Sequence, residues 1–290
     1  MRKLSTERRA MILTCLCEGM SIAATTRMTG ASKVTVLRLL ADAGTLAAQF
    51  HDLTVRGLES RRVQVDELWS FCGGKERTKK QGADVEGSVW TWTAIDADSK
   101  LMISYLVGTR DSACAIEFMY DVADRVDSKM QLTSDGHKPY LEAVEECFGD
   151  NIDYAMLIKI YGQTNPEHAR YSPAVCTGSR KEAVIGQPDE NHVSTSFVER
   201  QNLTVRMQNR RFTRLTNAFS KKIDNHRHSV ALMYFHYNFV RKHQTIKTTP
   251  AVFAGIADKP MTMVGFVKML EKEEKAVKGR ITNYLSAGSK

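Results

Sequence analysis

Three acidic residues have the types and spacing that metal-assisted phosphoryl transfer requires. Asp66 lies in the strand-like segment RRVQVDELW, Asp135 directly follows the short apolar run MQLTS, and Glu199 lies in a helical segment further along the chain. Mg²⁺ and Mn²⁺ prefer hard oxygen ligands, and two-metal phosphoryl transfer needs carboxylates that flank ions roughly 3.5 to 4 Å apart. We therefore predict that Asp66, Asp135 and Glu199 are catalytic metal ligands for Mg²⁺ or Mn²⁺.

Glu199 is favoured over Glu182 and Glu190 as the third acid because a cation stands two helical turns after it. Asn202 and Arg206 are three and seven residues further along, which places all three side chains along one side of a helix. Glu182 and Glu190 precede the helix and have no cation at that spacing. For each acid taken alone, a solvated surface carboxylate is the competing interpretation.

Positive charge is concentrated in two segments that flank an acidic centre. Residues 1–62 contain 10 basic and 5 acidic side chains, residues 63–198 contain 13 and 22, and residues 199–249 contain 11 and 2. This pattern favours a protein that holds a polyanion with its basic segments and performs metal chemistry in its acidic segment.

The first 45 residues predict three short helices. Thr6 can cap the first helix, which ends at Gly19, the second covers residues 21–28, and Ser32 can cap the third. A helix, a glycine-containing turn and a further helix are typical of a helix-turn-helix DNA-binding domain. A plain three-helix bundle with a charged outer face is the alternative. The side chains expected to contact DNA are Lys33, Thr35 and Arg38.

The remaining chain predicts an α/β catalytic domain over residues 61–255, after a linker at 46–60. Three strand-like runs come first, followed by a helix, a strand, a helix and a fifth strand, which predicts a mixed five-stranded sheet with flanking helices. Residues 161–191 lack periodicity and contain three of the six prolines, so we predict an inserted loop there. Residues 256–290 are expected to form a helical C-terminal tail.

Four motifs, in order, resemble the Asp-Asp-Glu domain of bacterial and archaeal insertion-sequence transposases, and in particular the family of insertion sequence 1. They are VQVDELWSF, LTSDGHKPYLEAVEECF, SFVERQNLTVRMQNR and the integrase-like tail YNFVRKHQTIKTTPAVFAGI. The resemblance implies a ribonuclease-H-like fold, a metal-dependent DNA transposase, and Asp66, Asp135 and Glu199 as its catalytic triad. The last two acids are 64 residues apart, which is longer than in compact members. Members often carry an N-terminal zinc-binding segment; this chain has no Cys-x-x-Cys pair, so no zinc is expected.

The resemblance also implies a reaction and its partners. Such an enzyme binds the terminal inverted repeats of a mobile element in double-stranded DNA. Metal-activated water frees a 3′-hydroxyl, which then attacks target DNA without a covalent protein intermediate. Bringing two ends together implies a homodimer or higher oligomer. The phosphates beside the site would be held by Arg206, Arg210, Arg211 and Arg214.

The composition argues against a membrane or secreted protein. No run approaches the roughly 18 apolar residues of a membrane span, and the six cysteines are scattered. We expect a cytoplasmic, nucleoid-associated protein.

Two other functions stay open on the sequence alone. A tyrosine-type site-specific recombinase would use the cluster Arg227, His228, Tyr234, Tyr237, Arg241 and His243. A non-enzymatic helix-turn-helix transcription regulator would combine a DNA-binding domain with a sensor domain. Metal dependence would separate the regulator from the transposase, and a phosphotyrosine adduct would identify the recombinase.

Overall fold

The computed structural model describes residues 4–75, 87–162, 176–214 and 216–287, which form two compact units. The sheet unit comprises Val55–Phe71 and Ser88–Leu203, and the helical unit comprises Met1–Thr54, Cys72–Gly87 and Thr204–Lys290. The units are interleaved along the chain, whereas the domains expected from the sequence are consecutive ranges. The division into functional domains stays a prediction.

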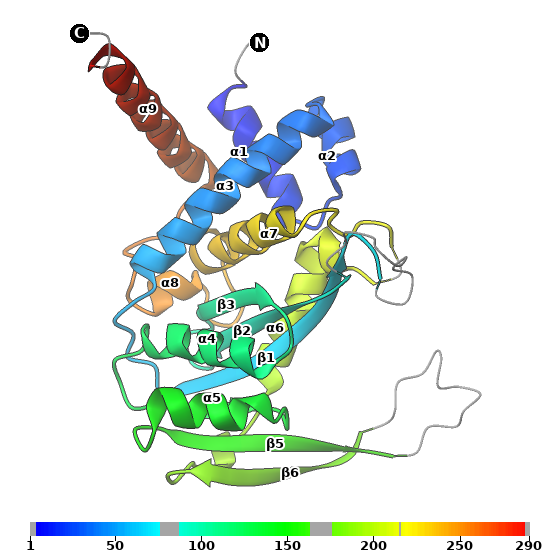
Figure 1. Cartoon of the computed structure of the whole chain (residues 1–290), viewed down its shortest axis with the longest axis vertical. Coiled ribbons are helices and arrows are strands. Elements are labelled where there is room, and N and C mark those ends of the chain that lie inside the picture. Colours follow the sequence, from blue (N-terminus) through cyan, green and yellow to red (C-terminus); the bar gives the residue numbers. More distant parts are fainter. Residues whose placement is uncertain (1–3, 76–86, 163–175, 215, 288–290) are drawn as a thin grey trace. The chain divides into compact units, whose positions relative to one another are not determined.

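The sheet unit is built on a mixed six-stranded sheet with the strand order β3-β2-β1-β4-β5-β6 (Figure 1). The strands are β1 (Arg62–Cys72), β2 (Gly87–Asp96), β3 (Met102–Gly108), β4 (Gln131–Ser134), β5 (Asp153–Tyr161) and β6 (Cys176–Ile185). The helical elements are α4 (Ser112–Ala123), α5 (Pro139–Phe148), the 3₁₀ turn η2 (Glu190–His192) and the start of α6 (Ser196–Gln208). This arrangement is consistent with the ribonuclease-H-like fold that the motifs imply.

The central strands are parallel and the outer strands are antiparallel. β4 pairs in parallel with β1 and β5, whereas β2 pairs with β3 and β5 with β6 in antiparallel fashion. Thr93 Oγ1 donates to the carbonyl of Asp66 and Ser70 Oγ to that of Val89, so β1 and β2 also run in opposite directions. The carboxyl end of β4 therefore lies beside the middle of β1, which continues to Cys72.

The predicted five-strand count was wrong, because β6 lies within the segment expected to be an inserted loop. Residues 163–175 of that segment are outside the described residues. Nearly all side chains of β6 are exposed. Its pairing with β5 comes from backbone hydrogen bonds, which leave no alternation of buried and exposed residues in the sequence.

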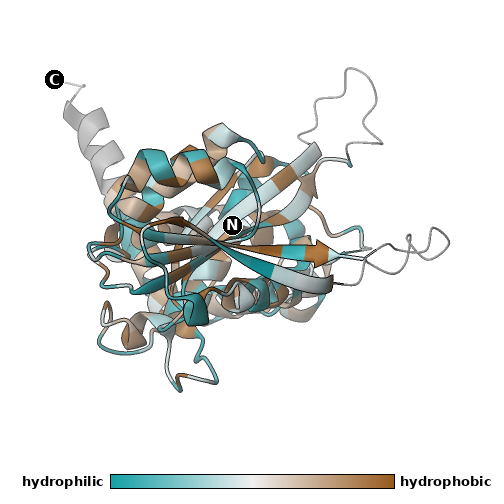
Figure 2. Cartoon of the chain, turned by 90° about the horizontal axis from the view of Figure 1, so that it is seen from below, coloured by the Kyte–Doolittle hydropathy of each residue, from teal (hydrophilic) through white to brown (hydrophobic). Residues whose placement is uncertain are grey.

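Helices cover both faces of the sheet. Trp92 on β2, Phe118 on α4 and Tyr140 on α5 are fully buried, with the Trp92 ring centroid 5.9 Å from that of Phe118 and 5.4 Å from that of Tyr140. On the other face, Gln64 of β1 contacts the start of α6. Figure 2 shows hydrophobic and hydrophilic residues interspersed along these helices and strands, as expected for elements with one buried side.

The helical unit is formed by elements from both ends of the chain. The helices before the sheet are α1 (Thr6–Cys17), α2 (Ile22–Thr29) and α3 (Lys33–Thr54). Those after it are the end of α6, η3 (Arg210–Phe212), α7 (Ile223–Phe235), the π-helical turn η4 (His236–Val240), α8 (Pro250–Phe253) and α9 (Met263–Ala287). Ser5 rather than Thr6 caps α1, since its hydroxyl accepts the N–H of Arg8. Ser32 does accept the N–H of Thr35, as predicted.

The first part of the predicted linker is helical, because α3 continues to Thr54. Ala47 and His51 of this segment are buried, and the Phe50 ring packs edge-on against Phe235 and Phe239 at centroid distances of 5.5 and 5.0 Å. Small and polar residues occupy the buried face here, so an apolar stripe is hard to recognise in the sequence.

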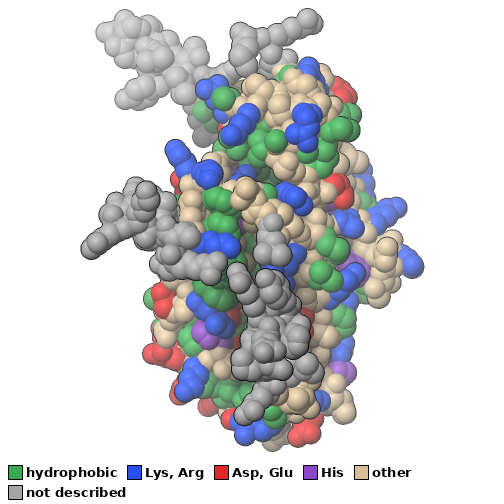
Figure 3. Space-filling view, turned by 90° about the vertical axis from the view of Figure 1, so that its right-hand side faces the viewer, with side chains coloured by type: hydrophobic (Ala, Val, Ile, Leu, Met, Phe, Trp, Pro, Cys, Tyr) green, Lys and Arg blue, Asp and Glu red, His purple; other side chains and the backbone are tan. Residues whose placement is uncertain are grey.

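Charged side chains are distributed widely over the surface. Figure 3 shows Lys and Arg side chains spread among hydrophobic and neutral ones on the displayed face. In the described part of the chain, no helix combines the length and apolarity needed to cross a membrane.

Candidate metal site

The parallel pairing of β1 and β4 brings Asp66 and Asp135 together. Gln64 of β1 is in register with Thr133 of β4, and each aspartate stands two residues further along its own chain segment. The two carboxylates therefore lie side by side where β4 ends beside the middle of β1, on neighbouring strands as the sequence predicts. Asp66 and Asp135 are both partly buried.

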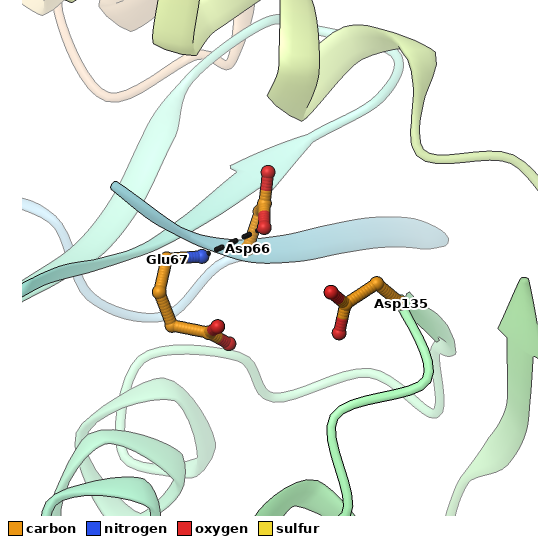
Figure 4. A group of neighbouring side chains, drawn as sticks. All are labelled: Asp66, Glu67 and Asp135. Carbon is orange, nitrogen blue, oxygen red and sulfur yellow. Dashed lines mark hydrogen bonds between the residues drawn. The ribbon is translucent and has the colours of Figure 1, made fainter. Parts of the chain in front are cut away.

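Glu67 joins this pair, which sequence reasoning missed. One ligand oxygen from each of Asp66, Glu67 and Asp135 lies within 4.8 Å of the others (Figure 4). Because side chains alternate along a strand, Glu67 belongs to the opposite face from Asp66, yet its longer side chain bends back toward Asp135 in Figure 4. The sequence signal that could have identified Glu67 is its place in the strand-like segment VQVDELW, where a second acid directly follows Asp66 and precedes Leu68.

Hydrogen bonds hold Asp66 and Asp135 in place. Asp66 Oδ1 accepts the N–H of Glu67 at 2.8 Å, and Asp66 Oδ2 accepts from Nδ2 of Asn202 on α6 at 2.7 Å. Asp135 Oδ1 accepts the N–H of His137 at 2.9 Å. Donors from the protein thus orient two of the carboxylates and leave further oxygen lone pairs for a ligand.

The carboxylates repel one another in a partly desolvated setting. Burial, followed by the charge of Asp135, raises the pKa of Asp66 to about 6. Burial and the charges of Asp135 and Asp66 raise the pKa of Glu67 to about 7, even though Arg110 Nε donates to its Oε2 at 3.1 Å. The buried Tyr140 hydroxyl also hydrogen-bonds Glu67 and opposes the rise in its pKa, but burial outweighs it. This surplus of negative charge fits a divalent cation bound between the three carboxylates.

The structure places Glu199 near this group but outside it. Its Oε1 accepts from Nζ of Lys159 on β5 and from Oγ1 of Thr195, both at 2.5 Å. Its charge also contributes to the raised pKa of Asp66. The alternative acid Glu182 lies partly buried on β6 and pairs with Arg180.

Helix α6 is anchored to the sheet at its start. Gln64 Oε1 accepts the N–H groups of Phe197 and Val198 at 2.8 and 3.1 Å, which satisfies two of the amides left free at a helix N-terminus. Together with the Asn202 contact to Asp66, this anchor fixes the part of α6 that carries Glu199.

The residues predicted to bind DNA all lie in the helical unit. Lys33 and Arg38 are exposed on α3, and Thr35 is partly exposed. Arg206 and Arg210 are partly exposed and Arg214 is exposed. Arg211 differs from the others, because its Nη2 atom is buried.

The tyrosines of the recombinase alternative are not accessible. Tyr234 is fully buried and Tyr237 is 5% exposed, so neither hydroxyl can attack a DNA phosphate in this conformation. Burial raises the pKa of Tyr237, which further disfavours a nucleophilic phenolate.

Comparison with known proteins identifies no family for this chain. No protein-family model matches the sequence. No curated protein matches it. Among solved structures it is similar to the piggyBac transposase, determined by cryo-electron microscopy as a synaptic complex with hairpin DNA, at 11% identity over 93% of this chain and 71% of that chain, with a TM-score of 0.38. At this level of likeness, the activity and the DNA partner describe that protein alone.

Proposed function

We propose that this chain is a metal-dependent DNA transposase of the Asp-Asp-Glu type. The observation that carries the proposal is the cluster of Asp66, Glu67 and Asp135, which forms where β4 ends beside its parallel neighbour β1. The resemblance of four ordered motifs to insertion-sequence transposases supports the particular reaction: cleavage at the 3′ ends of a mobile element and strand transfer into target DNA.

In this proposal Asp66 and Asp135 bind Mg²⁺ or Mn²⁺, and Glu199 is the third catalytic acid. When bound, the cations polarise a phosphodiester oxygen and activate water or a 3′-hydroxyl for in-line attack. Asn202 holds Asp66 in the orientation needed for binding, and Lys159 and Thr195 hold the Glu199 carboxylate. Glu67 adds negative charge and a buried oxygen to the same site.

The helical unit would supply DNA recognition. Lys33, Thr35 and Arg38 would contact the terminal inverted repeats, and Arg206, Arg210, Arg211 and Arg214 would hold phosphates. Synapsis of two ends would require a homodimer or higher oligomer, acting on DNA of the bacterial or archaeal nucleoid.

Strand cleavage of a labelled duplex tests the reaction. The substrate carries the inverted repeats that flank the coding sequence, and the reaction is run with Mg²⁺ or Mn²⁺ and with excess chelator. We expect a nick that releases a 3′-hydroxyl at the repeat end only when the metal is present. Cleavage that persists in chelator, or a protein adduct on the DNA, would contradict the proposal.

Sequence recognition is tested by Arg38→Ala. If the exposed Arg38 side chain contacts a base edge, its loss weakens binding to the repeat by about 1 to 3 kcal/mol and leaves binding to a scrambled duplex nearly unchanged. Competition binding of the two duplexes to the full chain measures the difference. An equal loss on both duplexes would assign Arg38 to the phosphate backbone.

A further inference from the structure

A cavity of about 630 Å³ lies within the helical unit, bounded by α1, α2, α3, α7 and the segment between α6 and α7. This volume is within the roughly 300 to 1,000 Å³ typical of small-molecule sites. One part of its wall is apolar and is formed by Leu16, Met20, Leu37, Leu40, Leu232 and Met233. The cavity can therefore accommodate the organic body of a ligand as well as a charged group.

The charged groups that line this cavity are all positive. They are Arg27, Lys33, Arg210, Arg211 and Lys221, and no Asp or Glu is among the lining residues. In the described part of the chain, none of these five side chains forms an ion pair. Such a concentration of unneutralised positive charge favours a ligand with more than one negative charge.

Arg211 distinguishes this cavity from an ordinary basic surface. Its Nη1 donates to Ser220 Oγ at 2.7 Å, but its Nη2 is buried and has no hydrogen-bond partner among the described residues. Burial lowers the pKa of Arg211 to about 10, so the guanidinium is still charged at neutral pH. Arg211 lines the cavity, so its charged guanidinium adds to the positive charge that an anion bound there would meet.

The polar groups of the cavity are suited to a flat, hydrogen-bonding body. Asn217 and Asn225 line it, and within the described residues neither side-chain amide makes a hydrogen bond. The Phe219 ring also lines it, with Nζ of Lys221 4.0 Å from the ring centroid. Amides pair with the edges of nucleobases, and an aromatic face can stack on a base.

We infer that this cavity binds a nucleoside phosphate, with the phosphate on Arg211 and the base against the apolar wall. The nucleotide is either free or part of a DNA strand, since both present the same phosphate and base. Binding of a free nucleotide goes beyond the proposed transposase reaction, whereas binding of a nucleotide within a DNA strand rests on that proposed function, because Lys33, Arg210 and Arg211 are among its proposed DNA contacts. The inference does not depend on the carboxylate site, which lies in the sheet unit.

Titration calorimetry on the full chain in excess chelator tests the inference, because chelator prevents cation-mediated binding at the carboxylates. The probes are deoxyadenosine monophosphate, deoxyadenosine, inorganic phosphate and a short single-stranded oligodeoxynucleotide. We expect the monophosphate to bind more tightly than either the nucleoside or phosphate alone. If only the oligonucleotide binds, and does so through Arg211, the ligand is a nucleotide within a DNA strand.

Arg211→Met removes the charge with little change in side-chain length, and Lys222→Met is the matched control because Lys222 is exposed and does not line the cavity. Arg211→Met should weaken binding by about tenfold or more, whereas Lys222→Met should leave it unchanged. The ligand should also raise the melting temperature of the wild type but not of Arg211→Met, a difference that a merely structural arginine would not produce.

A second variant keeps the test valid if Arg211→Met does not fold. Leu37→Trp narrows the apolar part of the cavity and should abolish binding of the monophosphate while circular dichroism stays native. The inference is overturned if neither the monophosphate nor the oligonucleotide binds. It is equally overturned if deoxyadenosine binds as tightly as its phosphate, or if Arg211→Met and Lys222→Met behave alike.

Discussion

Asp66 and Asp135 are 69 residues apart in the sequence but close in the fold, because β1 and β4 pair in parallel in a register that places the two residues side by side. Changing either to Asn keeps the shape of the side chain but replaces a hard anionic ligand with a neutral amide. We expect Asp66→Asn and Asp135→Asn to lose Mn²⁺ binding in calorimetry and to lose DNA cleavage, with DNA binding retained. Asp150→Asn is the control, since Asp150 is an exposed carboxylate elsewhere in the sheet unit. If Asp66→Asn or Asp135→Asn cleaved DNA at nearly the wild-type rate, these residues would not be the metal ligands.

Glu199 and Glu67 compete for the role of third acid, and paired variants separate them. Glu199→Gln should reduce cleavage by more than about a hundredfold if Glu199 acts on the reacting phosphate, because a carboxamide cannot replace a carboxylate as a metal ligand. Glu67→Gln should cleave at a rate closer to that of the wild type. Single-turnover cleavage at saturating Mg²⁺ measures both. If Glu67→Gln cleaved more slowly than Glu199→Gln, Glu67 rather than Glu199 would be the third catalytic acid.

At the scale of single residues, the sequence predicts contacts that follow from the order of the strands, such as that of Asp66 with Asp135. It does not predict contacts that depend on the length and path of one side chain, such as that of Glu67. The juxtaposition of Asp66 and Asp135 follows from placing Asp66 on the first predicted strand and Asp135 at the end of the fourth, with the two strands side by side. Alternation along a strand assigns Glu67 to the other face, and only the length of its side chain returns it to the group. The burial of Arg211 Nη2 results from the packing of Arg211 against Ser220 and the segment around it. A local sequence pattern does not predict this packing.

At the scale of elements, predictions succeeded where large apolar residues mark a buried face and failed where they do not. The helix predicted after the first three strands is α4, which begins after Asp111, whose Oδ1 accepts the N–H of Cys114 at 3.0 Å. Strand β6 was missed because its side chains are exposed on both faces and only its backbone pairs. The end of α3 was missed because Ala47 and His51, rather than large apolar residues, occupy its buried face.

The packing of α3 against α7 depends on Gly44. A Cβ atom at Gly44 would lie 2.5 Å from Cα and 2.7 Å from the carbonyl oxygen of His228 on α7, distances that require the helices to separate. Alanine normally stabilises a helix by up to about 1 kcal/mol relative to glycine, but here we expect Gly44→Ala to lower the free energy of unfolding by about 1 to 3 kcal/mol. Urea unfolding followed by circular dichroism measures the change.

Gly265 provides the matched control for this substitution. It lies near the start of α9, and its Cβ would meet only the Oγ1 atom of Thr262, at 3.3 Å. Gly265→Ala should be neutral or slightly stabilising. If Gly44→Ala behaved in the same way, the close approach of α3 and α7 would not contribute to stability.

At the scale of the whole molecule, buried titratable groups give opposing dependences of stability on pH. Burial lowers the pKa of His226 to about 3 and of His236 to about 4, so these histidines favour the folded state above about pH 6.5 and lose that contribution as the pH falls. Asp66 and Glu67 act in the opposite direction, because their raised pKa values make ionisation unfavourable in the fold. The pH dependence of the free energy of unfolding of the wild type therefore combines both effects. The difference between the wild type and a variant of the carboxylate site separates the contribution of that site.

Glu67→Gln provides that difference. The folded pKa of Glu67, about 7, lies above its ordinary value of 4.5, so the folded state holds the proton more tightly and ionisation destabilises the fold. This penalty is absent below about pH 4.5 and complete above about pH 7. Without metal, Glu67→Gln should therefore match the wild type near pH 4.5 and exceed its free energy of unfolding at about pH 8 by an amount on the order of 3 kcal/mol. Urea unfolding in chelator at the two pH values measures this gain.

Saturating Mg²⁺ at about pH 8 should reverse the order of the two proteins, since a cation bound to the ionised carboxylates stabilises only the folded state and binds the wild type more tightly. Glu145→Gln is the matched control, because it removes an exposed carboxylate of α5 and should show neither the pH-dependent gain nor the response to metal. A gain for Glu67→Gln that was equal at both pH values would mean that the gain does not come from the ionisation of Glu67. A gain at the higher pH that Mg²⁺ left unchanged would mean that the three carboxylates share no cation.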